Sequence, residues 1–276
     1  MTNPWELYER LIDEIPPEPR VTSAVRSGQW CRVGSDCGGV GMAFNLPEQS
    51  RPRSRQDDEV VGMGLRDAAA LARSWNLAEA GMGAAALNAW YAAPEVASAH
   101  GFAPCLMNNF AHLFDPWIDE ARGRRVGVIG HFPFARRALA EAGEVVILER
   151  STRDGDYPDS ACEYELASCD LVFITGSSFV NKTAPRLLAL TADCPRTIVV
   201  GPSTPASPAL LDYGADTVLA FSCADAARLE DGLAGRLLAG MYDAGERIEL
   251  HREGAEPSGP VVAAALPTRV LPLAPA

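Results

Sequence analysis

Residues 171–190, LVFITGSSFVNKTAPRLLAL, form the stretch that decides the fold of this chain. Residues 171–175 predict a buried strand, residues 176–183 a loop of small and polar residues, and residues 184–190 the start of an apolar helix. A strand that leads through a loop into a helix is the repeating unit of a parallel α/β sheet. Because ligands in such sheets bind at the carboxyl ends of the strands, the loop 176–183 is a candidate binding site.

The same alternation continues on both sides of this stretch. Further strands are predicted at 124–130, 144–149, 197–202 and 217–221, and helices at 131–143, 159–167 and 224–239. Apolar strands with helices between them predict a parallel, Rossmann-like sheet with right-handed crossover connections. We therefore expect an α/β fold in which a Rossmann-like domain occupies residues 116–250.

Residues 1–115 have a different pattern. Apolar residues at 5, 8, 11, 12 and 15 predict an amphipathic helix, which prolines at 16 and 17 end. Short strand-like pieces follow over residues 21–44, and two more helices over 65–75 and 78–91. These elements predict a smaller α+β domain. At the other end of the chain, residues 251–276 are rich in Pro and Ala and predict a partly disordered tail.

Composition and charge restrict the partners. The formal net charge is −12, whereas nucleic-acid binding needs clustered basic residues. No apolar run approaches the roughly 20 residues of a membrane span. The seven cysteines form no CxxC pair, and the N-terminus is acidic and amphipathic, which predicts reduced thiols in the cytoplasm. The expected partners are a small-molecule or metal ligand and a second copy of the chain, without nucleic acid or membrane.

The loop 176–183 is similar to a phosphate-binding loop. It matches GxxxxGK[ST] except that Asn181 stands at the second Gly, and Asn tolerates left-handed backbone. A phosphate-binding loop normally follows the first strand of its sheet, however, and this one follows the third. Binding of an anion or a polar ligand is therefore favoured over nucleotide hydrolysis. The role of Lys182, the only lysine of the chain, is left open.

The loop after the first strand of the sheet permits a nucleotide cofactor or a metal. Gly127 and Gly130, in GVIGHFP, fall short of GxGxxG because Pro133 stands at the third glycine. Glu149 ends the second strand, where dinucleotide-binding folds place the acid that contacts ribose hydroxyls. This pattern predicts S-adenosylmethionine or NAD, and the alternative is a tight turn without a ligand. His131, at the same edge, is a candidate metal ligand or acid–base group.

Two further groups of residues carry alternatives. In GPSTP (201–205), the hydroxyls of Ser203 and Thr204 either contact a ligand or cap the next helix. His100, Cys105 and His112 are a candidate metal set, with help from Asp115 or His131, although their spacings fit no zinc module.

Five motifs together resemble one protein family. They are GGVGMAF (38–44), AGMGAAALNA (80–89), GHFPF (130–134), ITGSSFVNKT (174–183) and GPSTPASPALLDYGAD (201–216). Over most of residues 10–240 the chain is similar to the heavy-metal chelation family, formerly known only as a domain of unknown function. The resemblance implies an enolase-N-terminal-like domain, a Rossmann-like domain, and a site in the cleft between them. By position, it implies a cleft lined by Asn88, Gly130, His131, Gly176, Ser177, Asn181, Gly201, Pro202, Thr204 and Pro205.

Two function classes follow. In the first, the cleft binds a metal (a transition-metal ion, with His131 as a ligand) or a metal complex, or helps to make a metal-chelating small molecule. In the second, the protein is an enzyme that binds S-adenosylmethionine or NAD at Gly127, Gly130 and Glu149. Whether the site is catalytic, and which reaction it would catalyse, stays open.

Overall fold

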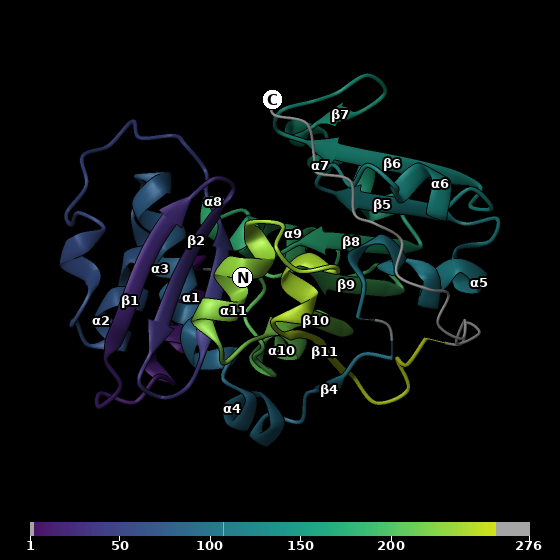
Figure 1. The fold of residues 1–276 in the computed structure, drawn as a ribbon. Coiled ribbons are helices and arrows are strands. Elements are labelled where there is room, and N and C mark those ends of the chain that lie inside the picture. The colour runs from purple at the N-terminus through teal and green to yellow at the C-terminus, as the bar shows by residue number, and fades with distance from the viewer. Residues whose placement is uncertain (1–2, 107, 258–276) are drawn as a thin grey trace.

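The structure is a computed structural model that describes residues 3–106 and 108–257. It contains a three-stranded antiparallel sheet and an eight-stranded, mostly parallel sheet, with helices packed around both (Figure 1). The predicted α/β fold class, with a smaller unit before the parallel sheet, is confirmed. Most of the predicted tail, residues 258–276, lies outside the described residues.

The first domain packs helices on one face of the small sheet. Its strands are β1 (Val21–Ser27), β2 (Trp30–Ser35) and β3 (Val40–Phe44), in that order, and its helices are α1 (Trp5–Asp13), α2 (Leu65–Ala70), the 3-10 turns η1 (Asp58–Val60) and η2 (Leu71–Arg73), and α3 (Leu77–Tyr91). A Cβ atom at Gly41 of β3 would lie 2.1 Å from the backbone of Ala85 and Ala89. Glycine at 41 therefore lets α3 approach the sheet closely, in agreement with its Ala- and Gly-rich sequence.

Residues 94–121 connect the domains and also contribute to the second one. They form α4 (Pro94–Ala99), β4 (Ala103–Pro104), η3 (Phe110–His112), η4 (Asp115–Trp117) and α5 (Ile118–Ala121). The short strand β4 pairs with the last strand of the large sheet, through Pro104 and Ala103. The chain thus enters the second sheet before the domain boundary that we predict at residue 115.

The large sheet has a topological switch point. Its strands are β5 (Arg125–Ile129), β6 (Glu144–Glu149), β7 (Tyr157–Pro158), β8 (Leu171–Thr175), β9 (Arg196–Val200), β10 (Thr217–Ser222) and β11 (Glu246–His251). The order is β4-β11-β10-β9-β8-β5-β6-β7, and β5 to β10 are parallel. The chain runs outward from β5 to β6 and β7 and then returns to β8 on the other side of β5. The connections on the two sides of this point therefore run in opposite directions, and the loops after β5 and β8 diverge. Doubly wound sheets bind ligands at such a point.

Two helices of the second domain are shorter than the sequence predicts. The helices and 3-10 turns of this domain are α6 (Ala135–Ala138), η5 (Asp159–Ala161), α7 (Cys162–Glu165), η6 (Leu166–Ser168), α8 (Ser178–Asn181), α9 (Ala184–Leu190), α10 (Ala209–Asp212), α11 (Ala226–Leu233) and η7 (Gly240–Asp243). The helix predicted over 131–143 is one turn, α6, and the helix predicted over 224–239 ends at Leu233. The prediction contained neither β11 nor the single turn α8 inside the loop 176–183.

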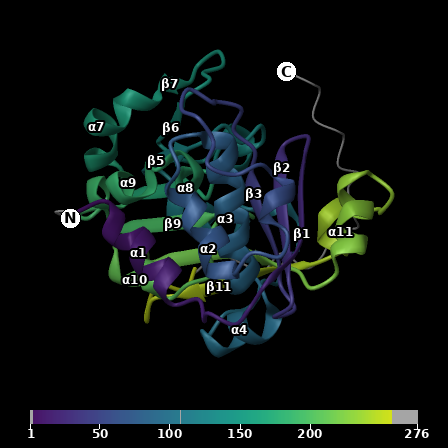
Figure 2. The same cartoon turned by 90° about the vertical axis from the view of Figure 1, so that its left-hand side faces the viewer.

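Both faces of the large sheet are covered, which is why its strands read as continuous apolar runs. Val128 and Phe173 face Phe114 and Trp117 on one side, whereas Val172 and Ile174 belong to the core that continues into the first domain. Residues of β3 also pack against Leu229 of α11. In Figure 2, where the first domain faces the viewer, the small sheet lies between α3 and α11. No helix among the described residues is long and apolar enough to cross a membrane.

Candidate functional site

Three predicted loops lie at one edge of the large sheet. They follow β5, β8 and β9, which are neighbours in the sheet, and so the loops that begin at Gly130, Gly176 and Gly201 share the carboxyl edge. Two of these loops approach each other closely, because a Cβ atom at Gly176 would lie 2.5 Å from the backbone nitrogen of Thr204. Glycine at 176 is therefore required by this contact, and the loops form one surface.

The first domain closes over one half of this edge. The backbone N–H of Phe44 donates to the hydroxyl of Ser203 (2.9 Å), and the N–H of Val40 donates to the carbonyl of Cys223 (2.8 Å). Asn88 of α3 is buried, and its side-chain nitrogen donates to the carbonyl of Met42 (2.7 Å) and, over 3.5 Å, to that of Pro202. The ends of β9 and β10 are thus covered by β3 and α3. We call this contact the domain seam.

Buried polar atoms without a partner among the described residues lie at the domain seam and in α8, which packs against α3. They are Asn88 Oδ1, Ser178 Oγ and Thr204 Oγ1, and the three side chains are each no more than 2% exposed. A buried polar atom without a hydrogen bond is costly, of the order of 1–3 kcal/mol. Such atoms in a native protein call for an explanation, and a bound ligand or water that supplies the missing partner is one.

His131 lies in the other, more open half of the edge, after β5. Its Nδ1 atom is 2.8 Å from Oδ2 of Asp156, whose side chain has no exposed surface. The same carboxylate oxygen accepts the backbone N–H of Arg153 (3.0 Å). The second ring nitrogen, Nε2, has no hydrogen-bond partner in the described part of the chain, and the side chain is 20% exposed. A carboxylate on one ring nitrogen orients a histidine whose other nitrogen binds a metal or exchanges a proton.

Both carboxylate oxygens of Glu149 accept hydrogen bonds from backbone N–H groups. Its Oε2 accepts the N–H of His131 (2.8 Å), and its Oε1 accepts the N–H of Arg150 (2.7 Å). The carboxylate therefore holds the loop after β5 to the loop after β6. A ribose hydroxyl would have to share oxygens that already accept these bonds.

The other features of the predicted nucleotide site are explained by packing. Gly127 lies inside β5, and a Cβ atom there would be 3.1 Å from Sγ of Cys169. The helix after Gly130, α6, has only four residues and begins at Ala135. A dinucleotide site uses the N-terminus of a longer helix directly after the glycine loop, so this loop lacks that feature.

Asn181 and Lys182 close the turn between α8 and α9. Asn181 Oδ1 accepts the N–H and the hydroxyl of Thr183, at 3.1 and 2.6 Å. Lys182 has a left-handed backbone (φ 67°), and its Nζ donates to the carbonyl of Val180 at 3.0 Å and lies 5.5 Å from the ring centre of Trp75. Burial lowers the pKa of this amine to about 8. The lysine is thus turned back onto α8, which gives a phosphate-loop function no support.

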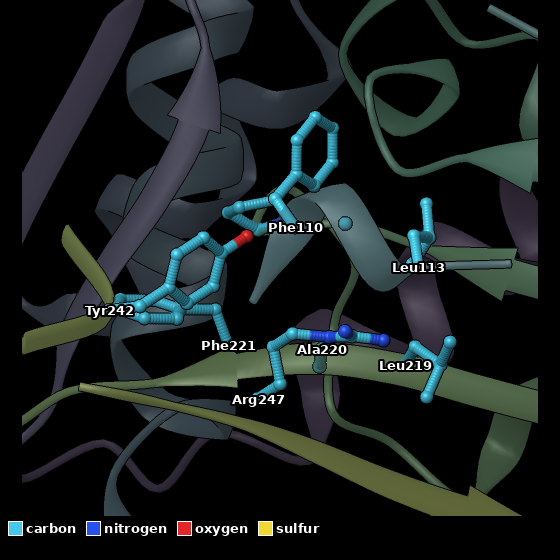
Figure 3. Close-up of a pocket in the computed structure, with 9 residues that line it drawn as sticks. Phe110, Leu113, Leu219, Ala220, Phe221, Tyr242 and Arg247 are labelled. Carbon is cyan, nitrogen blue, oxygen red and sulfur yellow. The ribbon is translucent and has the colours of Figure 1, made fainter. Parts of the chain in front are cut away.

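The loop after β9 borders a small pocket. Gly201 and Pro202 line it together with Phe110, Leu113, Leu219, Ala220, Phe221, Tyr242 and Arg247. Figure 3 shows Phe110 across the pocket from Arg247 of β11. The space open to the centre of a water molecule is about 10 Å³, enough for about one water. Arg247 is only 5% exposed and donates to the carbonyl of Asn109 (2.9 Å), so it ties the connecting segment to β11.

The alternative metal set is not assembled. His100 Nε2 is bonded to Glu14 (2.8 Å) and Nδ1 lies 3.4 Å from the carbonyl of Ala206, whereas His112 Nδ1 contacts Asp115 (2.6 Å). Residues 3–106 and 108–257 contain no group of three or more His, Cys, Asp or Glu residues that could hold a metal ion. The structure therefore does not join His100, Cys105 and His112 into a metal site.

Asp156 is the functional candidate that the sequence does not reveal. It lies in the polar loop RSTRDGDYPD (150–159), which reads as exposed surface. Only the fold brings it to His131, 25 positions earlier in the chain. Of the predicted cleft residues, Gly130 and His131 lie in the open half of the edge, Asn88, Gly176, Thr204 and Pro205 are buried at the domain seam, and Ser177, Asn181, Gly201 and Pro202 are half-buried.

Comparison with known families agrees with the resemblance of the motifs. Two family models, DUF4213 and DUF364, match residues 8–91 and 112–241, and both are described as "Putative heavy-metal chelation". The crystal structure of a DUF364-family protein of unknown function from Desulfitobacterium hafniense is similar to 90% of this chain and 98% of its own, with 36% identity and a TM-score of 0.80.

A second crystal structure shares the fold. This DUF364-family protein of unknown function from Pyrococcus horikoshii is 20% identical, with a TM-score of 0.70, over 89% of this chain and 100% of its own. No match was found among curated proteins. The chain belongs to the DUF364 family, as its motifs predict.

Proposed function

We propose that this protein binds a metal or a metal complex, or helps to make a metal-chelating small molecule, at the carboxyl edge of its large sheet. The single observation that carries the proposal is the pair of His131 and Asp156. A buried carboxylate holds one ring nitrogen and leaves Nε2 without a partner among the described residues, at the switch point of the sheet. The description of the family agrees with a metal-linked role.

The chemistry of His131 follows from this contact. Asp156 favours the tautomer with the proton on Nδ1, so that Nε2 presents its lone pair. Glu149 fixes the backbone of the same residue through its N–H. Both restraints reduce the number of positions that the imidazole can adopt, which lowers the entropy cost of binding.

The domain seam would supply the contacts to an organic ligand. Asn88 Oδ1 accepts hydrogen bonds, and the hydroxyls of Ser178 and Thr204 both donate and accept them. These atoms lack partners among the described residues, so a ligand with polar groups that opens the seam would pair them without breaking a hydrogen bond that they already make.

The nucleotide alternative has weaker support. The acid expected to bind ribose, Glu149, already accepts backbone N–H groups, and the helix after Gly130 has only four residues. The strand order around β5 still permits a nucleotide. Adenosine compounds are therefore tested as alternative ligands in the experiment below.

The test compares ligand binding in two valine variants. Purified protein is titrated with nickel, cobalt and zinc salts, with their nitrilotriacetate complexes, and with S-adenosylmethionine and NAD, and binding is measured by calorimetry. Thr204→Val removes a seam hydroxyl, and Thr197→Val removes a buried hydroxyl at the opposite end of β9. We expect a metal species to bind. Thr204→Val should lower its affinity roughly tenfold, the equivalent of about 1.4 kcal/mol, and Thr197→Val should leave it unchanged.

Two results would reject the proposal. One is binding of adenosine compounds without any metal species, which would support the nucleotide alternative. The other is metal binding that Thr204→Val and His131→Ala both leave at the wild-type affinity, since the metal would then lie elsewhere.

A further inference from the structure

The side chains of this protein do not fit a bare metal ion. Transition-metal sites in proteins take three or four side-chain ligands. The described residues contain no group of three or more His, Cys, Asp or Glu residues that could hold a metal. Residues 1–2, 107 and 258–276, the rest of the chain, contain none of these four residue types. A single chain therefore does not provide a full set of ligands.

The cysteines are poor candidates for separate metal ligands. Burial raises the pKa of six of the seven thiols, those of Cys31, Cys105, Cys162, Cys169, Cys194 and Cys223. The thiolate is the form that binds a metal, so a raised pKa lowers the fraction of the binding form at neutral pH.

Of the four histidines, His131 is the one placed to offer a nitrogen at the carboxyl edge. Both ring nitrogens of His100 have partners, and those of His251 contact Thr217 and Glu249. His112 also keeps a ring nitrogen without a partner in the described part of the chain, but it lies in η3, in the segment that connects the domains. His131 lies two residues beyond the end of β5, at the switch point.

We infer that the metal reaches this protein already chelated by an organic molecule, and that Nε2 of His131 fills one vacant coordination position of that complex. The inference rests on the proposed function and names its ligand class, a transition-metal chelate with at least one exchangeable position. One imidazole supplies one ligand, and the organic molecule supplies the others.

The experiment uses three nickel species. Free Ni²⁺ has all its positions open to exchange, Ni–nitrilotriacetate has some of them open, and Ni–EDTA has none. Binding is measured by equilibrium dialysis with nickel quantified in both compartments. We expect Ni–nitrilotriacetate to bind once per chain, roughly tenfold or more tightly than free Ni²⁺, and Ni–EDTA not to bind.

Variants test whether His131 is the residue that binds the chelate. His131→Ala should abolish binding of Ni–nitrilotriacetate, and Asp156→Asn should weaken it by about 10- to 100-fold, the usual effect of removing the partner of a metal-bound histidine. His112→Ala is the matched control, because this histidine also pairs with an Asp through Nδ1, and it should bind as the wild type does. Circular dichroism and the urea midpoint of each variant confirm that it is folded.

The outcomes separate this inference from the proposed function. Free Ni²⁺ that binds as tightly as the chelate, with both lost in His131→Ala, would overturn the inference and leave the proposed function in place. Binding of the chelate that persists in folded His131→Ala would also overturn it. If neither free Ni²⁺ nor Ni–nitrilotriacetate binds, and the zinc and cobalt species do not bind either, both the inference and the proposed function fail.

Discussion

Nδ1 of His131 lies 2.8 Å from Oδ2 of Asp156, and this carboxylate has no exposed surface. Its other oxygen, Oδ1, has no partner among the described residues. The pair joins the loop after β5 to the loop after β6 at the open half of the carboxyl edge. A buried carboxylate depends on its few donors, so His131 contributes to stability as well as to the proposed site.

His131→Ala should therefore destabilise the protein by about 1–3 kcal/mol, because a buried carboxylate loses one of its two donors. Urea unfolding at pH 7 measures the change. His112→Ala should cost less, since the side chain of its partner Asp115 is 19% exposed and water can replace the lost bond. Equal losses in the two variants would contradict this account of Asp156.

Two glycines of α3 should respond differently to alanine. A Cβ atom at Gly83 would lie 2.0 Å from the backbone nitrogen of Ala72, so Gly83→Ala must push η2 away and should cost about 3 kcal/mol or more. At Gly81 the nearest atoms are Sγ of Cys31, at 3.0 Å, and the backbone oxygen of Phe44, at 3.2 Å. Alanine gains about 1 kcal/mol in helix propensity there, which offsets shifts of a few tenths of an ångström in the sulfur and the Phe44 carbonyl. Thermal unfolding of the two variants makes the comparison, and similar melting temperatures would refute it.

The stability contribution of Lys182 should depend on pH. Burial lowers its pKa from 10.5 to about 8, whereas the nearby charge of Glu79 opposes this shift. Between these two values the unfolded chain binds more protons than the folded one, so stability rises with pH relative to a variant without the amine. Lys182→Met should therefore be more stable than the wild type at pH 7, by about 1–2 kcal/mol because the side chain keeps some contact with water. The difference should shrink between pH 8 and 10.5. Urea unfolding of both proteins over this range gives the curves, and parallel curves would count against the lowered pKa.

Glu79 should hold the polar segment 48–58 until the protein is acidified. Its Oε1 accepts the N–H of Ser54 (2.7 Å), the hydroxyl of Ser54 (2.8 Å) and the N–H of Arg55 (2.8 Å). Burial alone would raise its pKa, but these bonds and one from Ser74 lower it below 4.5. The stabilisation is therefore complete above pH 4.5 and is lost as the pH falls through the lowered pKa.

Substitution of this carboxylate gives the test. Glu79→Gln should cost about 1–3 kcal/mol at pH 7 and little at low pH, where the wild-type carboxyl is also protonated. Proteolysis within residues 48–58 reports the release of the segment. A wild-type segment that is cleaved equally fast at neutral and acid pH would rule out this role of Glu79.

Local sequence patterns predicted the parts of the fold that local interactions determine. The strands at 144–149 and 171–175 and the helix at 184–190 have the predicted bounds, because uninterrupted apolar runs end at turn residues. By contrast, β4 has two residues and exists only through its pairing with β11. No local pattern can reveal such a strand.

The candidate site shows the same limit. The sequence alone predicts that the loops after Gly130, Gly176 and Gly201 share one edge, because ligand-binding loops follow the carboxyl ends of parallel strands. The partner of His131 could not be found in this way, since Asp156 lies in an exposed-looking loop and reaches the histidine only in the folded chain. The likeness of the separate domains to enolase-N-terminal and Rossmann-like domains, the homodimer and the cytoplasmic location stay predictions.

The pairing of β4 with β11 also has a consequence for biosynthesis. β11 lies between β10 and β4 and carries Arg247, which binds the carbonyl of Asn109. Until residues 246–251 have left the ribosome, one edge of β10 is unpaired and β4 has no strand to pair with. An unpaired edge strand is a template for aggregation. The sheet that carries the site is therefore completed only when the last described strand emerges.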